Sequence, residues 1–121
     1  MANQIVWCDI PVKDLDRAIR FYSAVLGHPV AKHTVGDMTF GLLPDADTGV
    51  SGCLVEGDDH TPSADGPMIY MNCEGRLAVA VATVELNGGK ILKAKHSIAP
   101  HGFRAIVRDS EGNRIALHSN S

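Results

Sequence analysis

The sequence contains two copies of one pattern. An apolar run over residues 5–10 precedes an amphipathic segment over 14–26 and Gly27, and an apolar run over 68–73 precedes an apolar segment over 77–86 and Gly88-Gly89. A short chain with two copies of one supersecondary unit buries the faces that the copies share against each other. We therefore expect two similar modules with a ligand groove between them; the alternative is a chance similarity of strand-helix-strand patterns, because identities are few. The matching residues are Leu15 and Leu77, Gly27 and Gly89, Phe40 and Phe103, and Leu54 and Leu117, at offsets of 62 or 63.

The most clearly marked element is a helix over 14–26. Asp14 is suited to cap its first turn, apolar residues recur at helical spacing, and Gly27 and Pro29 end it. We predict strands over 4–11, 30–35, 38–43 and 51–55, a linker over 57–67, and a second copy with strands over 68–73, 90–95, 103–108 and 114–119 and a helix over 76–87. The fold class is then α+β, one domain over 1–121 in which two β-α-β-β-β modules (4–56 and 68–119) form an incomplete barrel with a concave cup.

Composition and charge narrow the range of partners. The chain has 121 residues, 45% of them hydrophobic, and a net charge of -3, so it lacks the basic footprint of a nucleic-acid-binding protein. It has no apolar run of roughly 18 residues for a membrane span and no signal-peptide pattern at its start. Three widely spaced cysteines suggest neither a disulfide framework nor a CxxC motif. We expect a cytoplasmic homodimer that binds a small molecule, with neither nucleic acid nor membrane as partner.

Two stretches carry a resemblance to a known family. Residues 10–22 (Ile-Pro-Val-Lys-Asp-Leu-Asp-Arg-Ala-Ile-Arg-Phe-Tyr) with Leu26-Gly27 resemble the opening of the vicinal oxygen chelate superfamily, which includes glyoxalase I, bleomycin and fosfomycin resistance proteins and extradiol dioxygenases. Residues 109–113 (Asp-Ser-Glu-Gly-Asn) and the strand after them are similar to its closing turn, with Ser110 where Pro is commoner. Residues 62–66 and 117–119 resemble a small glyoxalase-like bacterial subgroup whose chemistry is largely unassigned. The resemblance implies the cup-shaped fold and two-fold pairing of chains.

The resemblance also implies four positions for a metal site. In glyoxalase I a ligand lies on the first strand of each copy and another on the last. These positions fall on Trp7 and Met68, and on Cys53 and Ala116. Apolar side chains cannot bind a divalent ion through oxygen or nitrogen, and one thiol is not a site. We therefore predict no metal and no cofactor, and none of the metal-dependent activities of glyoxalase I, fosfomycin resistance proteins or extradiol dioxygenases.

Strand alternation predicts which side chains line the cup, while Val6, Cys8 and Ile10 would face the helices. Trp7 is either a packing residue or a stacking platform, and Asp9 is either a general base, if partly buried, or a partner for an arginine or a loop. Cys53 fits the usual role of a free cysteine as a small buried hydrophobe, and His118 is either solvated or a ligand contact that titrates near neutrality. The predicted ligand-binding residues are Trp7, Asp9, Cys53, Tyr70, Asn72 and His118.

The remaining histidines leave one further possibility. His96 and His101 flank a short segment before the Phe103 strand, where a two-histidine metal site is conceivable although no carboxylate partner is evident. The other three, His28, His33 and His60, are predicted to be exposed.

Two functions fit this sequence. The favoured one is a small-molecule-binding protein without chemistry, as the resemblance to bleomycin resistance proteins implies. The alternative is a metal-independent isomerase, epimerase or lyase that uses Asp9, Tyr70 or His118 as an acid or base. A regulatory protein would require an exposed apolar patch.

Overall fold

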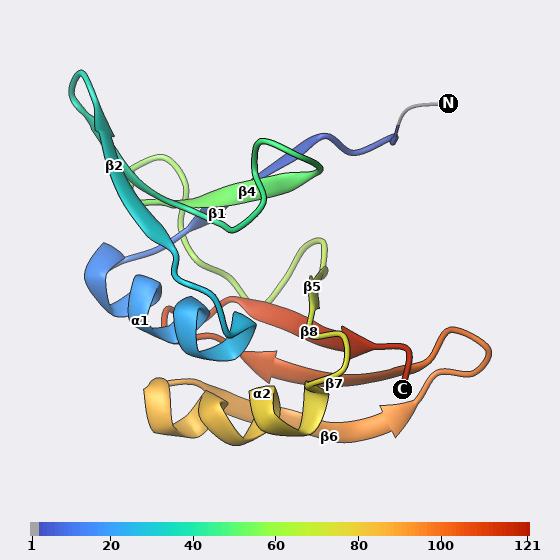
Figure 1. Ribbon diagram of the computed structural model, residues 1–121. Coiled ribbons are helices and arrows are strands. Elements are labelled where there is room, and N and C mark those ends of the chain that lie inside the picture. The colour runs from blue at the N-terminus through green and yellow to red at the C-terminus, as the bar shows by residue number, and fades with distance from the viewer. Residues whose placement is uncertain (1–2) are drawn as a thin grey trace.

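The computed structural model describes residues 3–121 and confirms two tandem β-α-β-β-β modules (Figure 1). The first consists of β1 (Trp7–Pro11), α1 (Leu15–Leu26), β2 (Ala31–Val35), β3 (Met38–Leu42) and β4 (Ser51–Val55). The second consists of β5 (Ile69–Asn72), α2 (Leu77–Val84), the 3-10 turn η1 (Glu85–Asn87), β6 (Lys90–Ser97), β7 (Phe103–Arg108) and β8 (Arg114–Ser119). No helix within residues 3–121 is long and apolar enough to cross a membrane.

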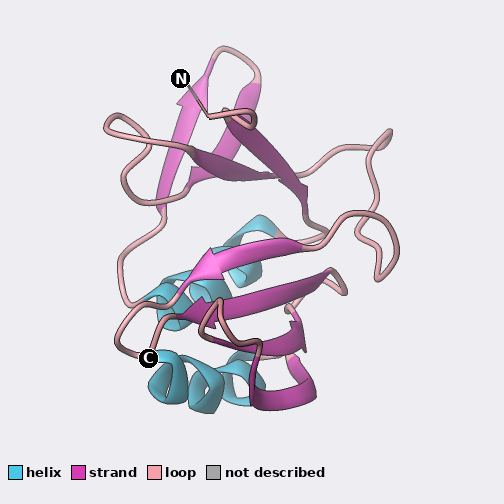
Figure 2. Ribbon diagram, turned by 90° about the vertical axis from the view of Figure 1, so that its right-hand side faces the viewer, coloured by secondary structure: helices cyan, strands magenta, loops and turns pink. Residues whose placement is uncertain are grey.

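Each module builds one four-stranded sheet with the same topology. The strand orders are β1-β4-β3-β2 and β5-β8-β7-β6, with the first strand of each module parallel to the last and the other pairs antiparallel. The repeat extends to single bonds, because Val12 N donates to Val55 O and Cys73 N donates to His118 O, both over 2.8 Å. Counting back along β1 and β5 from Val12 and Cys73 makes Trp7 the counterpart of Met68. In Figures 1 and 2 the sheets form separate layers, and β1 and β5 are free edges.

The first helix forms as its sequence predicts. The Asp14 side chain accepts from Arg17 N at 3.1 Å, and Gly27 ends the helix with a φ of 73°. The second helix is shorter than the predicted 76–87, because no side chain caps its start and the chain tightens into η1 after Val84. Gly88, with a φ of 92°, therefore ends the second helical segment as Gly27 ends the first.

The two modules share one hydrophobic core on the helix side of the sheets. The helices lie side by side, α1 below the sheet of module one and α2 below that of module two (Figure 1). Gly89 lies where this packing is closest: a Cβ there would be 2.6 Å from both Phe21 Cε2 and Arg108 O. The buried core includes Ile10, Leu15, Ala18, Phe21, Tyr22 and Val25 from module one and Leu77, Ala80, Val84, Ala105, Val107, Ile115 and Leu117 from module two.

Two strand boundaries differ from the prediction by more than one residue. The first strand begins at Trp7, not at residue 4, because its pairing with β4 begins where Trp7 lies opposite Ser51, the first residue of β4. Val6, which was predicted to face the helices, is consequently exposed. Strand β6 continues to Ser97 instead of ending at residue 95, since His96 pairs with Arg104 and Ser97 with Phe103.

The closing turn of module two holds the start of α1. One oxygen of Glu111 accepts from Lys13 N and Asp14 N, each at 2.8 Å, and the Glu111 carboxylate also binds both Nε and Nη2 of Arg17. Asp109, nearby and buried, accepts from the Tyr22 hydroxyl of α1 at 2.5 Å. These bonds fix the orientation of one module relative to the other.

Candidate ligand-binding site

A cavity of about 1040 Å³ lies between the two modules. Residues of β1 and β5, the linker, the loop before β4 and the start of β8 form its walls. Ligand pockets commonly measure roughly 300–1,000 Å³, so this cleft is large enough for a small organic molecule. Four of the six predicted ligand-binding residues line it, namely Trp7, Asp9, Tyr70 and Asn72, whereas Cys53 and His118 do not.

On the side of module one, Asp9 joins two other predicted residues. Its Oδ1 accepts from Trp7 Nε1 at 3.2 Å and from Cys53 Sγ at 3.3 Å. Burial, aided by the bond to Asp9, raises the pKa of the Cys53 thiol to about 11, so Cys53 is protonated and a donor at neutral pH. Asp9 itself is exposed, which removes the burial on which the general-base hypothesis depended.

On the side of module two, a polar row crosses the sheet away from its helix. Asn72, His118, Arg104 and His96 are paired in register across β5, β8, β7 and β6. The ring of Tyr70 meets the His118 ring edge-on, with centroids 6.2 Å apart. The predicted His118 therefore contacts a residue of the cleft, although it lines a shallower neighbouring depression with Asn120.

Arg104, which the sequence analysis did not consider, contacts Tyr70 of the cleft although it does not itself line the cleft. Its Nη1 donates to Tyr70 Oη, and its Nε donates to His96 Nε2 at 3.0 Å. The alternation of β7 contains the signal that could have found it: buried Ala105 and Val107 face the core, so Arg104 and Ile106 face away from the helix.

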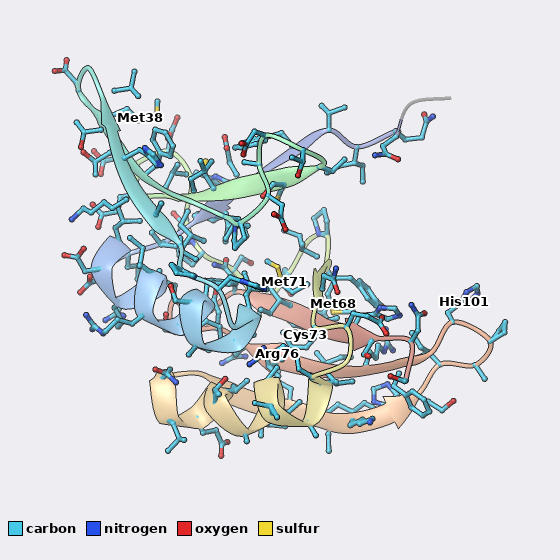
Figure 3. The ribbon with its side chains drawn as sticks, viewed as in Figure 1. Met38, Met68, Met71, Cys73, Arg76 and His101 are labelled. Carbon is cyan, nitrogen blue, oxygen red and sulfur yellow. The ribbon has the colours of Figure 1, made fainter. Side chains whose placement is uncertain are left out.

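The two histidines considered as a metal pair serve different contacts. His96 lies in β6 beside Arg104, while His101 lies in the β6–β7 loop, at the far right of Figure 3, and its carbonyl accepts from His118 Nε2 at 2.7 Å. Within residues 3–121, no three His, Cys, Asp or Glu side chains are grouped as a metal site requires. The predicted exposure of His28, His33 and His60 is confirmed.

The four positions implied for a metal do not fit one. Trp7 and Met68 offer an indole and a thioether, and Ala116 is buried without any donor atom. Cys53 is the only acidic donor among the four, and its raised pKa keeps it protonated at neutral pH. A hard or borderline divalent ion needs several carboxylate, imidazole or thiolate ligands, which this set does not supply.

Several solved structures have a similar fold. A glyoxalase/bleomycin resistance protein from Albidiferax ferrireducens T118 is 18% identical with a TM-score of 0.73, covering 98% of this chain and 100% of that one. The fosfomycin resistance protein FosX from Listeria monocytogenes is 16% identical with a TM-score of 0.69, covering 100% and 96%. A V278E mutant of glyoxalase I from Zea mays is 22% identical with a TM-score of 0.72, covering 95% of this chain and 45% of that one.

These likenesses establish the fold, and the sequence itself supplies the family. Among curated proteins, none matches the chain significantly. The family model of the Glyoxalase/Bleomycin resistance protein/Dioxygenase superfamily matches residues 4–117, nearly the whole length. Together with the paired β-α-β-β-β modules and the cleft between them, this match shows that the chain belongs to the glyoxalase/bleomycin resistance protein/dioxygenase superfamily.

Proposed function

We propose that this protein binds a small organic molecule in the cleft between its modules and does so without a metal ion. The observation that carries the proposal is the cavity of about 1040 Å³, which both modules line with aromatic, apolar and hydrogen-bonding side chains. Trp7 and Tyr70 are each more than 40% exposed there. Such a combination of aromatic surface and a few polar groups is typical of small-molecule sites.

The six predicted residues divide between two roles in this proposal. Trp7, Tyr70 and Asn72 contact the ligand, and Asp9 orients the Trp7 indole through its hydrogen bond. Cys53 donates a hydrogen bond to the Asp9 carboxylate, and the ring of His118 packs edge-on against the ring of Tyr70.

Tryptophan fluorescence tests the proposal. Trp7 is the only tryptophan, and nitroaromatic molecules quench tryptophan emission, so 4-nitrobenzamide should quench Trp7 saturably. Val50→Asp, which places a charge at the cleft, should weaken binding by about tenfold or more, as expected when an apolar contact in a ligand pocket is replaced.

Val79→Asp is the matched control, because Val79 is a similarly exposed valine on α2 outside the cleft. It should leave affinity unchanged. Linear, non-saturable quenching in all three proteins would refute the proposed site.

The metal-free state has its own test. The donor chemistry of Trp7, Met68, Cys53 and Ala116 supports it. Elemental analysis of protein purified without chelator or affinity tag should find well below one zinc, nickel, iron or manganese per chain. About one equivalent that is lost on mutating cleft residues would contradict this part of the proposal.

We also propose a homodimer. Two apolar residues at the tip of the β2–β3 hairpin, Val35 and Met38, are 68% and 60% exposed and pair with each other on one face; Met38 projects from the body of the molecule in Figure 3. Exposed apolar patches and unpaired strand edges favour association.

Light scattering coupled to size exclusion should give twice the chain mass of 12.9 kDa. Replacing Val35 and Met38 together by lysine should yield monomers, whereas Leu86→Lys, at an exposed apolar residue of η1, should not. A concentration-independent monomer of the unchanged chain would refute dimerisation.

Metal-independent acid-base catalysis is the second candidate. The observation that favours it is the contact between the Tyr70 and His118 rings on one face of module two. Turnover that is lost in His118→Ala while saturable quenching of Trp7 by 4-nitrobenzamide is retained would establish an enzyme. Equal loss of binding and turnover would instead support the binding function.

We place the protein in the cytoplasm as part of the same proposal. All three cysteines are free, and Cys53 and Cys73 are buried. Unpaired thiols are usual where the surroundings are reducing.

A further inference from the structure

We propose that the ligand of the cleft is a small organic anion whose carboxylate or phosphoryl group is bound by Arg104. This inference rests on the proposed function, since it names the class of molecule that the cleft takes. Arg104 is adjacent to the cleft because it donates to the hydroxyl of Tyr70 and lies 5.9 Å from the centre of that ring. A molecule bound against Tyr70 is thus within reach of the guanidinium.

The charge of Arg104 is not balanced by the protein. Within residues 3–121 the ion pairs are Arg17 with Glu111 and Lys32 with Asp16, and Arg104 belongs to neither. Arginine stays charged at any pH at which proteins are folded. A partly buried charge without a counterion is unfavourable, and an oxyanion would supply the missing partner.

The contacts of Arg104 fix the orientation of its guanidinium but use only some of its N–H groups. His96 Nδ1 lies 2.9 Å from Ala94 O, and since a carbonyl only accepts, Nδ1 carries the hydrogen. His96 Nε2 accepts from Arg104 Nε, so His96 is neutral in this arrangement. With Nε given to His96 and one Nη1 hydrogen to Tyr70, three of the five N–H groups remain for a ligand.

A neighbouring residue adds further donors. Asn72 lines the cleft, and its Oδ1 accepts from Glu74 N at 2.9 Å, which assigns the side-chain oxygen and leaves the Nδ2 hydrogens available. The corner formed by Arg104 and Asn72 therefore offers guanidinium and amide N–H donors, while the carboxylates of Asp9, Asp45 and Asp65 line the cleft from module one and the linker. A group of charged and amide donors favours an oxyanion over a neutral amide or alcohol at this corner.

The surrounding charges favour the same ligand. Lys93 pairs in register with Ile106 on the face that carries Arg104. Glu74, which follows β5 and also lines the cleft, has its Oε1 bound by Asn120 N and Nδ2 at 2.8 and 3.0 Å. Because the whole chain has a net charge of -3, this positive corner is a local feature rather than a general property of the surface.

Three probes that share the 4-nitrophenyl ring test the inference on the full chain. They are 4-nitrobenzoate, 4-nitrophenylphosphonate and neutral 4-nitrobenzamide, each titrated by calorimetry and by shifts of the backbone amides of β5, β7 and β8. We expect at least one anion to bind more than about tenfold tighter than the amide, as for a hydrogen bond to a charged group. The preferred anion distinguishes a carboxylate ligand from a phosphoryl ligand.

Variants of two arginines on one strand identify the group responsible. Arg104→Gln should reduce the preference for the anion to within about twofold, and Arg108→Gln, at the exposed far end of β7, should leave it intact. Arg104→Lys, which keeps the charge but not the planar fork, should retain part of it and serves if the Gln variant fails to fold.

The outcomes separate this inference from the proposed function. Equal affinity for the three probes, or an anion preference that survives Arg104→Gln, would overturn the anion site while saturable quenching of Trp7 still supported ligand binding. Failure of both anions to bind at concentrations up to about 10 mM, weaker than any useful affinity, would also overturn it.

Discussion

Glu111 offers the sharpest test of how the modules are held together. Its side chain is fully buried, belongs to the closing turn of module two and accepts four hydrogen bonds from the start of α1 in module one. Glu111→Gln keeps the size of the side chain but replaces one acceptor oxygen by an amide group that faces donors. We therefore expect this variant to fold less stably without a change in fold.

The magnitude follows from the pKa of the Glu111 carboxyl. Burial alone would raise this pKa, but the hydrogen bonds from Arg17, Asp14, Ser110 and Lys13 outweigh burial and lower it from 4.5 to about 2. Each pKa unit corresponds to about 1.4 kcal/mol, so the charged form contributes up to about 3 kcal/mol at neutral pH. Arg17 is partly exposed, and solvent screening reduces this to about 2 kcal/mol.

The pH dependence gives the test its sign. A carboxyl whose pKa is lower in the folded than in the unfolded state stabilises the protein above the unfolded value, near 4.5, and loses that contribution as the pH falls toward about 2. The difference in unfolding free energy between the unchanged chain and Glu111→Gln should be about 2 kcal/mol at pH 7 and should shrink steadily below pH 4.5. Urea denaturation followed by circular dichroism, at fixed protein concentration, measures it.

An exposed ion pair supplies the control. Asp16 binds Lys32 on the outer side of α1, with both side chains more than half exposed, so Asp16→Asn should cost less than about 1 kcal/mol at any pH. A difference for Glu111→Gln that is below 1 kcal/mol at pH 7, or that does not change between pH 5 and 2.5, would refute the assigned role of the carboxylate.

Two further substitutions test the shared core. Tyr22→Phe removes the donor to buried Asp109 and should lower the unfolding free energy by about 1–2 kcal/mol, whereas Tyr70→Phe, at an exposed hydroxyl, should change it by less than half as much. Burial, followed by the charge of Asp109, raises the pKa of Tyr22 well above its ordinary value, so the unchanged chain should lose stability as the pH rises above 10. The Phe variant should not show this loss, which urea denaturation at pH 8 and 10.5 measures. Gly89→Ala introduces a Cβ 2.6 Å from Phe21 and should cost about 1–3 kcal/mol, while Gly49→Ala, with open space around it, should be neutral; equal melting temperatures for the two would contradict the close packing of the helices.

Much of the fold could be predicted because its signals are local. Asp14 and Gly27 mark the ends of α1 through side-chain capping and a positive φ, and these depend only on neighbouring residues. Alternation within each strand also predicted that Trp7, Asp9, Tyr70 and Asn72 line one cup; all four line the cleft, and their role in binding stays a prediction.

The repeat was recognised, but one residue correspondence in it was misleading. Gly27 and Gly89 match in sequence, yet the left-handed helix end of module two is Gly88. Gly89 is required for a different reason, the approach of Phe21 from the other module. Because Gly89 and Phe21 are far apart in the sequence, no local sequence pattern predicts their contact.

The candidate site shows the same limit. Ile91 pairs with buried Val107 and Lys93 with Ile106, residues on opposite faces, because the register of β6 shifts between them. An irregularity of this kind reverses the alternation, so the position of His96 beside Arg104 could not be read from the strand pattern. The hydrogen bond from Cys53 to Asp9 and the contact of the His118 ring with the Tyr70 ring likewise depend on the pairing of strands.

The sequence by itself determined the two β-α-β-β-β modules, the limits of the first helix and the absence of oxygen and nitrogen ligands at the positions implied for a metal, because hydrophobic period, capping residues and side-chain chemistry are properties of short segments. Only the tertiary structure decided that Glu111 holds α1, that the cleft lies between β1 and β5, and that Arg104 stands beside it without a counterion. These features arise from contacts between modules and from strand register, which are set by the packing of the whole chain.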